Sequence, residues 1–211
     1  PDLIISDVMM PKKNGYEVCD TLKKDIRTSH IPIIILTAKS DADSRISGLQ
    51  VGADAYLAKP FNEKELFVRL EKLLEIRKTL QERYRSMDGK KSVEAPENRL
   101  EDTFILEIQK IIYTHLSDET FGIAELCQAI HMSRTQLHNK LKSLTGQSTS
   151  RYIRSLRMHK AKELLANQAE LNITDIAFET GFSNLKYFSK IFAEEIGSSP
   201  SQYRKKYLSE Q

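Results

Sequence analysis

The second half of the chain contains a near-repeat, and this repeat constrains the fold more than any other feature. The matched positions are Leu126 with Ile176, Met132 with Phe182, Ser133 with Ser183, Leu137 with Phe188, Leu141 with Phe192 and Gly146 with Gly197. The first three pairs are offset by 50 residues and the last three by 51, so one residue is inserted after the turn. A helix–turn–helix unit that occurs twice is the simplest account of this pattern.

These units are expected at about 121–146 and 173–197, joined by a linker helix at about 148–166. A further apolar face at helical spacing precedes them, formed by Phe104, Ile108, Ile111, Ile112 and Leu116. We therefore predict an all-α domain over residues 99–208.

In the first 78 residues, short apolar runs alternate with amphipathic stretches. Leu3–Ser6, Ile31–Thr37 and Ala55–Ala58 are bounded by turn signals and predict buried strands. Helical spacing lies between them, at Tyr16–Lys23 and at Ile46–Gln50. Strands that alternate with helices predict an α/β domain with a parallel sheet over residues 1–78.

Residues 79–98 are predicted to be a helical extension followed by a linker. The helical spacing that starts near Asn62 continues past residue 78, and the polar residues 86–98 contain Gly89 and Pro96. Because the chain opens with Pro1 and enters a strand almost at once, we expect a fragment of a longer protein.

Composition indicates a soluble globular protein of two domains. The chain has 211 residues, of which 40% are hydrophobic and 29% charged, and its net charge is +3. No apolar run approaches the roughly 20 residues of a membrane-spanning helix. Cys19 and Cys127 form no CxxC pair, which fits a reducing cytoplasm. Whether the full-length parent is anchored in the inner membrane stays open.

Three side chains at the ends of the predicted strands suit phosphate chemistry. Asp7, Thr37 and Lys59 end or follow separate strands, and the carboxyl ends of parallel strands meet at one edge of a sheet. A carboxylate there can attack phosphorus, while an ammonium and a hydroxyl stabilise the phosphoryl oxygens. A divalent cation would be needed to bring the carboxylate and the phosphate together.

This half resembles the receiver domain of two-component response regulators. The resemblance rests on the stretches Ser6–Pro11, Leu36–Ala38 and Gly52–Phe61. It implies the last three strands of a flavodoxin-like doubly wound fold. It also implies that Asp7 is the phosphoacceptor, that Thr37 and Lys59 bind the phosphoryl group, and that Tyr56 is the aromatic switch. The Lys59–Pro60 bond is expected to be cis.

The Mg²⁺ site that the resemblance implies is incomplete in this sequence. Asp7 and the backbone carbonyl of Met9 are the expected metal ligands, but the family's acidic pair after the first strand is missing. Mg²⁺ prefers octahedral oxygen coordination. We therefore expect Mg²⁺ in the intact receiver, no bound cofactor in this chain, and inefficient phosphorylation of Asp7.

The low net charge conceals a basic segment. Residues 126–162 contain no acidic residue and eight basic ones: Arg134, Lys140, Lys142, Arg151, Arg154, Arg157, Lys160 and Lys162. A basic stripe on a helical unit is typical of a protein that binds a polyanion. A merely solvated basic face is the alternative.

The second helix of a helix–turn–helix unit places its first residues at base edges in the major groove. Ser133 and Gln136 predict a capping box at the start of this helix, and Ser183 predicts the corresponding cap in the second unit. The candidate DNA contacts are Ser133, Arg134, Thr135, Gln136, His138, Asn139, Lys140, Lys142 and Arg151, then Ser183, Asn184, Lys186, Ser189 and Lys190. Of these, Lys140 and Arg151 are expected at phosphates or in solvent.

The second half resembles the DNA-binding domain of the AraC/XylS family. The resemblance rests on Phe121–Cys127, Met132–Arg134, Leu141–Ser148, Tyr152–Arg154 with Arg157, Ile173–Ala177, Gly181–Ser183, Tyr187–Phe192 and Gly197–Pro200. It implies two recognition helices that enter successive major grooves. By motif position, it implies base readers at Thr135, His138 and Asn139 and at Lys186, Ser189 and Lys190.

Together these features predict a non-enzymatic, sequence-specific transcription regulator that is controlled by phosphorylation of Asp7. The expected partners are double-stranded promoter DNA, a histidine kinase domain acting in cis or in trans, and RNA polymerase, with a homodimer left open. One alternative is the C-terminal part of a membrane-bound hybrid sensor histidine kinase, whose parent would carry kinase activity. A less favoured one is an α/β phosphatase-like enzyme that uses Asp7.

Overall fold

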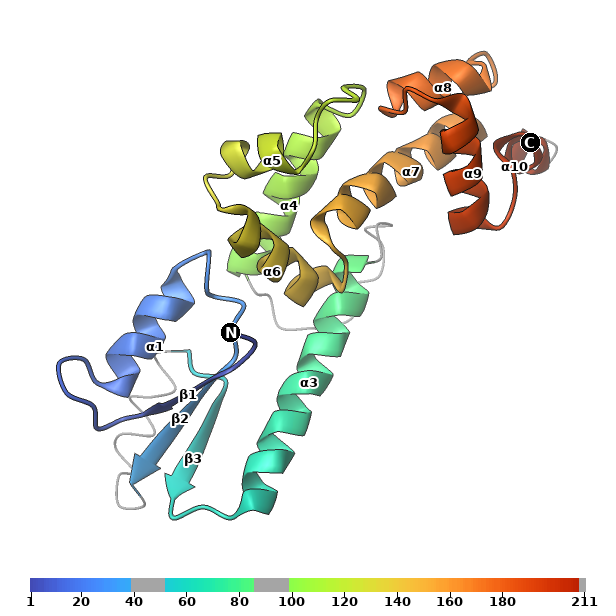
Figure 1. Cartoon of the computed structure of the whole chain (residues 1–211). Coiled ribbons are helices and arrows are strands. Elements are labelled where there is room, and N and C mark those ends of the chain that lie inside the picture. Colours follow the sequence, from blue (N-terminus) through green and yellow to red (C-terminus); the bar gives the residue numbers. More distant parts are fainter. Residues whose placement is uncertain (39–51, 86–98, 209–211) are drawn as a thin grey trace. The chain divides into compact units, whose positions relative to one another are not determined.

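The computed structural model describes residues 1–38, 52–85 and 99–208. The chain forms two compact units, one of Pro1–Ile105 with Asn139–Gly146 and the other of Leu106–His138 with Gln147–Gln211. Helices α4 (Arg99–Thr114) and α6 (Arg134–Thr145) contribute residues to both units. Figure 1 shows the elements in chain order.

A parallel sheet forms the centre of the first unit. Its strands are β1 (Ile4–Asp7), β2 (Ile33–Ala38) and β3 (Ala55–Lys59), in that spatial order. β2 pairs with both neighbours, and its residues 33–35 are all isoleucines that are fully buried. A strand covered on both faces is expected to be a continuous apolar run. The α/β prediction for this half is confirmed.

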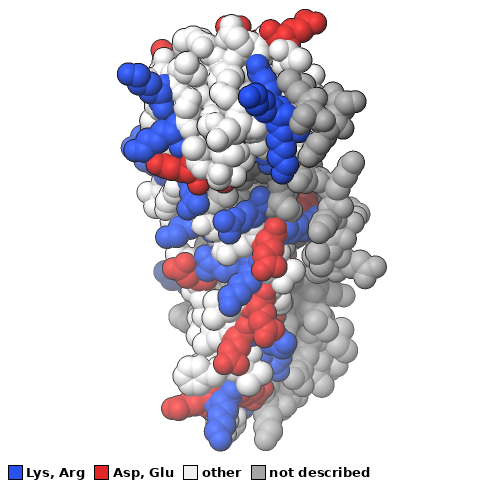
Figure 2. All heavy atoms as spheres, turned by 90° about the vertical axis from the view of Figure 1, so that its right-hand side faces the viewer, with Lys and Arg blue, Asp and Glu red and all other residues white. Residues whose placement is uncertain are grey.

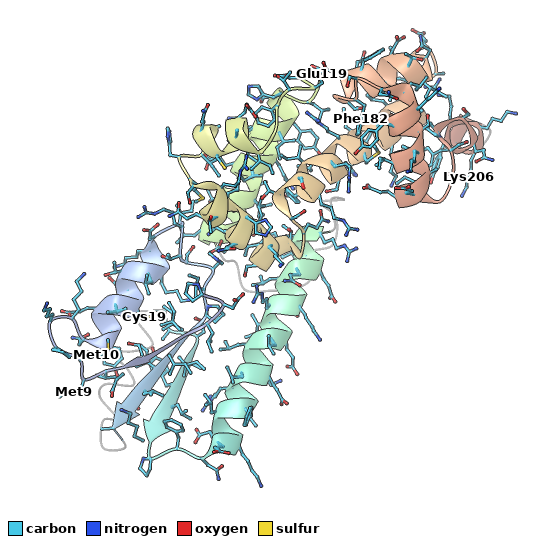
Figure 3. All side chains as sticks on the ribbon, viewed as in Figure 1. Met9, Met10, Cys19, Glu119, Phe182 and Lys206 are labelled. Atoms are coloured by element: carbon cyan, nitrogen blue, oxygen red, sulfur yellow. The ribbon has the colours of Figure 1, made fainter. Side chains whose placement is uncertain are left out.

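Two helices cover the two faces of this sheet. α1 (Gly15–Lys24) packs through Cys19 against Ile33 and Ile35, and Figure 3 shows Cys19 on the side of α1 that faces the strands. α3 (Glu63–Arg85) packs through Leu73 against Ile34. Consecutive side chains of β2 therefore point to opposite faces of the sheet, as the two-residue period of a strand requires.

α3 runs on beyond the sheet. It ends at Arg85, so residues 79–85 continue the helix as the spacing predicted. The predicted linker 86–98 and the predicted helical stretch Ile46–Gln50 lie outside the described residues.

On the face drawn in Figure 2, Lys and Arg side chains stand in separate groups, with Asp and Glu between several of them.

The secondary structure of residues 99–208 is entirely helical, which confirms the all-α prediction for this described part. The first helix–turn–helix pair is α5 (Ile123–Ala129) and α6, and the second is α8 (Ile173–Glu179) and α9 (Leu185–Ile196). α7 (Thr149–Asn167) joins the pairs, and α10 (Pro200–Leu208) follows them. Gly146 and Gly197 end α6 and α9 at φ values of 71° and 83°, a left-handed backbone that favours glycine.

The core of the second unit is built on α7. Met158, Leu165 and their neighbours on α7 pack against Ile176 of α8 and against Phe188 and Phe192 of α9. Near the start of α7, the hydroxyl of Tyr152 accepts a hydrogen bond from Nε2 of Gln109 on α4 (3.2 Å). The start of the linker helix therefore contacts α4, and its later part packs against α8 and α9. None of the helices in the described ranges has both the length and the apolar character needed to cross a membrane.

Candidate functional site

Asp7 and Lys59 meet at the carboxyl edge of the sheet. Asp7 ends β1 and Lys59 ends β3, and the ammonium of Lys59 donates to the Asp7 carboxylate. The backbone N–H of Met9 donates to Oδ1 of Asp7 (3.2 Å). These two hydrogen bonds, first that from Lys59 and then that from Met9, lower the pKa of Asp7. Asp7 is therefore an ionised, partly exposed carboxylate with a cation beside it.

Thr37 and Tyr56 lie on the neighbouring strands. β2 continues one residue past Thr37 to Ala38, so the prediction that Thr37 ends its strand is wrong by one position. Thr37 is buried, and its register partner is Ala58, next to Lys59. Tyr56 packs against the cluster of Cys19, and burial raises its pKa to about 12, so the phenol stays neutral at neutral pH.

Gly15 holds the start of α1 against the backbone of Asp7. Its N–H donates to the carbonyl oxygen of Val8 (3.1 Å), and a Cβ at this position would lie 2.3 Å from the carbonyl oxygen of Asp7. Only glycine permits this approach. The candidate residues taken from the sequence omitted Gly15, although a glycine next to Asn14, which caps a helix, is a signal for it.

The residues of this site do not form a complete Mg²⁺ site. Asp7 is a single carboxylate already paired with Lys59, and no group of three or more His, Cys, Asp or Glu side chains in the described ranges could hold a metal ion. The Met9 carbonyl would add one oxygen, whereas Mg²⁺ requires about six. The Lys59–Pro60 bond is cis, as expected. Figure 3 shows Met9 and Met10 in the loop after β1.

The first recognition helix, α6, begins with the predicted capping box. The N–H of Ser133 donates to Oε1 of Gln136 (2.9 Å), and the N–H of Gln136 donates to Oγ of Ser133 (3.3 Å). Leu137, Leu141 and Leu144 are buried. The polar side chains Arg134, Thr135, Asn139 and Lys142 are exposed and His138 is half-buried.

Lys140 is not a DNA contact. Its side chain is 0% exposed, its Nζ lies 2.6 Å from Oε2 of Glu101, and it donates to Oγ of Ser29 (2.9 Å). The same hydroxyl donates to the other oxygen of Glu101 (2.7 Å). The prediction that Lys140 lies at a phosphate or in solvent is therefore wrong, because its charge is used inside the first unit.

The second recognition helix, α9, also presents polar residues. Asn184, Lys186 and Lys190 are exposed and Ser189 is half-buried. The cap of this helix is Asn184, whose Oδ1 accepts from the N–H of Tyr187 (3.0 Å). The prediction of a Ser183 cap is wrong by one residue, since an asparagine caps at least as well as a serine.

The basic segment 126–162 offers less free charge than its count suggests. Lys140 is buried, Arg154 pairs with Glu195 of α9 (3.2 Å), Lys160 pairs with Glu163 (3.0 Å), and Arg157 binds backbone carbonyls. The remaining four form no ion pair with any described residue: Arg134, Lys142, Arg151 and Lys162. Three of these four are exposed, Arg134 and Lys142 on α6 and Arg151 at the start of α7, so free positive charge gathers around the first recognition helix.

Each half of the chain is similar to a known protein family. Residues 1–71 match the response regulator receiver domain, and residues 126–206 match a helix-turn-helix domain. Histidine kinase P4 from Formosa agariphila is 37% identical over 98% of this chain, which spans 15% of that protein.

Two further proteins are similar to one half each. The regulatory protein PhoB of Pseudomonas aeruginosa is 51% identical over 35% of this chain and 32% of its own length. The C-terminal domain of the response regulator yesN from Fusobacterium nucleatum is 32% identical, with a TM-score of 0.45, over 49% of this chain and 98% of that one. The chain therefore joins a receiver domain of the response-regulator family to an AraC-type helix-turn-helix domain.

Proposed function

We propose that this chain is the output part of a two-component system and that it binds promoter DNA through α6 and α9. The observation that carries the proposal is the pair of recognition helices, each buried on one face and polar on the other. Asparagine amides can bond adenine, and lysine can reach the acceptors of guanine. Thr135, His138 and Asn139 on α6 and Lys186, Ser189 and Lys190 on α9 are the base readers in this proposal.

The remaining candidates position the protein on the DNA backbone. Arg134, Lys142 and Arg151 are exposed cations that suit phosphate oxygens. The capping box of Ser133 and Gln136 lies at the start of α6, and the cap Asn184, with Ser183 before it, lies at the start of α9. Contacts with phosphate fix the register of a protein on DNA, and contacts with base edges give the sequence preference.

Control by phosphorylation of Asp7 is the second part of the proposal. A carboxylate oxygen of Asp7 attacks phosphorus, the P–N bond of a donor phosphohistidine breaks, and the imidazole leaves with a proton. The product adds negative charge at the edge where Lys59 already lies, and Lys59 would then pair with phosphoryl oxygens. Thr37 would donate a hydrogen bond to the phosphoryl group, and Tyr56 would act as the aromatic switch. A local charge change of this kind biases a two-state element.

The chain spans 15% of its relative histidine kinase P4, and the context of the whole protein is a further part of the proposal. The phosphodonor is a histidine kinase domain, in cis in a hybrid kinase or in trans for a free regulator. RNA polymerase is the proposed downstream partner, and the site of action is the cytoplasm. A homodimer is compatible with DNA recognition by two helix–turn–helix pairs in each chain. Response regulators with helix-turn-helix output are typically non-enzymatic, and we propose the same for this chain.

A salt titration tests DNA binding directly. A preferred duplex is first selected from a random DNA library with the full chain, and its affinity is then measured between 50 and 200 mM salt, about the range in which such interfaces respond. With about six phosphates neutralised, log K should fall with log salt at a slope near −5. Failure to select any duplex, or a flat response to salt, would contradict the proposal. Release of phosphate from p-nitrophenyl phosphate would instead support the enzyme alternative.

A further inference from the structure

The linker helix α7 carries an arginine that contacts both helix–turn–helix pairs. Nη2 of Arg157 donates to the carbonyl oxygens of Asp118 (2.7 Å) and Phe121 (3.2 Å), in the loop before α5. Nη1 of Arg157 donates to the carbonyl oxygen of Gly181 (3.3 Å), in the turn between α8 and α9. One guanidinium therefore joins the entrance of the first pair to the turn of the second. All of these residues belong to the second unit.

The turn at Gly181 is shaped for this contact. Gly181 has φ of 76°, and a Cβ at this position would lie 2.4 Å from the carbonyl oxygen of Leu116 and 2.8 Å from Cζ of Arg157. The turn of the second pair thus packs backbone against backbone on the loop of the first. The side chain of Arg157 lies directly beside this close approach.

The loop that Arg157 binds is itself held in place. Asp118 accepts hydrogen bonds from the N–H (2.9 Å) and the hydroxyl (2.7 Å) of Thr120, and Phe121 stacks on His115 with 4.7 Å between ring centroids. A carbonyl on a fixed loop is a directional acceptor. The contacts of Arg157 therefore constrain orientation as well as distance.

Packed apolar side chains do not fill the space between the two pairs. A cavity of about 360 Å³ lies here, lined by Glu119 and Phe121 of the loop, Arg154 and Arg157 of α7, and Phe182 of the α8–α9 turn among others. Figure 3 places Glu119 in the loop before α5 and Phe182 in the turn between α8 and α9. The polar contacts of Arg157 thus carry the connection at a place where apolar packing is incomplete.

A planar guanidinium suits this place better than any other side chain. It presents five N–H donors in a fixed fork, so that it can serve acceptors on two sides at once. Burial lowers the pKa of Arg157, but an arginine keeps its charge in proteins. A lysine has one compact ammonium and cannot span the same three carbonyls.

We propose that Arg157 is a positioning residue that sets the mutual placement of the two recognition helices, and so the spacing of DNA half-sites that the protein accepts. The inference rests on the proposed DNA binding and deepens it. Rigid helix–turn–helix pairs read half-sites about one helical turn apart, because each pair must face the same side of the duplex. A loosened connection would accept several spacings at similar cost.

The test uses the full chain and the duplex selected with the wild-type protein. The spacer between its half-sites is changed by −1, +1 and +2 base pairs, and two further duplexes keep one half-site each. We expect the wild type to lose about 10-fold or more in affinity per changed spacing, as for a mismatched base pair. In the Arg157→Met protein, the loss of affinity per changed spacing should fall to about 2-fold. Its affinity for each duplex with a single half-site should equal that of the wild type. Lys160→Met is the matched control, because it removes one charge from α7 without touching either pair.

An Arg157→Met protein that keeps the wild-type spacing preference would overturn the inference. If circular dichroism shows that Arg157→Met does not fold, Arg157→Lys decides: a broadened spacing profile supports the inference, and an unchanged profile overturns it. Failure of the wild type to bind any selected duplex would contradict the DNA-binding proposal instead.

A second measurement does not need DNA. Spin labels at Gln128 of α5 and Glu194 of α9, two exposed positions, report the distance between the pairs in a Cys19→Ala, Cys127→Ser background. Arg157→Met should broaden this distance distribution, and Lys160→Met should not. An unchanged distribution in Arg157→Met would contradict the inference even where DNA binding is lost.

Discussion

Lys140 and Glu101 form an ion pair of 2.6 Å whose side chains are 0% and 1% exposed. Ser29 bonds to both partners, and the ammonium of Lys140 lies 4.8 Å from the centroid of the Phe104 ring. Charges withdrawn from water in this way remain stable only while each keeps its partner. The pair therefore ties α6 to α4 inside the first unit.

Removal of one partner of this pair should cost more than removal of both. Lys140→Met leaves the Glu101 carboxylate buried without a cation, and we expect a loss of about 3–5 kcal/mol in the free energy of unfolding. The double variant Lys140→Met, Glu101→Leu should lie within about 1 kcal/mol of the wild type, since a buried pair replaced by apolar residues is often neutral. Urea unfolding followed by circular dichroism measures both values.

Lys142→Met serves as the control for this comparison. Lys142 is exposed on the same helix, so its loss should change stability by less than about 0.5 kcal/mol. A Lys140→Met protein as stable as the control would show that the pair does not stabilise the fold.

His30 should make the protein sensitive to acid. Burial and then the nearby charges of Lys140, Arg77 and Lys23 lower its pKa to about 4, and its Nδ1 is buried without a hydrogen-bond partner among the described residues. The unfolded chain binds a proton near pH 6.5, whereas the folded one does so near pH 4. Between these values the unfolded state holds more protons, so stability falls as the pH falls.

The expected slope for this histidine is up to about 1.4 kcal/mol per pH unit within that window. His30→Gln should flatten the pH dependence of the unfolding free energy there and leave it unchanged above pH 7. Equal slopes for variant and wild type would show that His30 does not titrate as its environment requires.

Phosphorylation of Asp7 in this chain alone should be poor. The site offers one carboxylate, already bound to Lys59, and the described residues provide no acidic partner for a Mg²⁺ ion. Incubation with Mg²⁺ and acetyl phosphate should label only a small fraction of the chains, and Asp7→Asn should remove that labelling. Mass spectrometry of the intact chain measures the fraction, and stoichiometric labelling at Asp7 would refute the expectation.

The strand-end site could be predicted because strand ends are fixed by short-range patterns. Asp7 and Lys59 each follow an apolar run, and parallel strands bring such positions together regardless of loop details. The one-residue error at Thr37 has no effect on this conclusion. The close approach of Gly15 to Asp7 depends on how α1 meets the sheet, which no local pattern specifies.

The spacing of residues along the sequence indicates that Lys140 is buried, whereas a count of charges does not. Lys140 follows Leu137 by three residues and precedes Leu144 by four, so it lies on the buried face of α6. Glu101 precedes Phe104 by three residues, Ile105 by four and Ile108 by seven, so it lies on the buried face of α4. A lone cation on one apolar face and a lone anion on another indicate a buried pair. The meeting of the two helices is a tertiary fact that the sequence pattern does not contain.

The roles proposed for the recognition helices separate into two kinds of loss. Asn139→Ala or Lys190→Ala should cost about 1–3 kcal/mol at one operator position and relax the preference there, because each removes a contact with a base edge. Lys142→Ala should weaken all sequences about equally and reduce the salt slope by about 1, since it removes a phosphate contact. Competition binding against a panel of single-base variants of the selected duplex distinguishes these patterns. If Asn139→Ala leaves the preferred sequence unaltered while Lys142→Ala shifts it, the assignment of base readers on α6 is wrong.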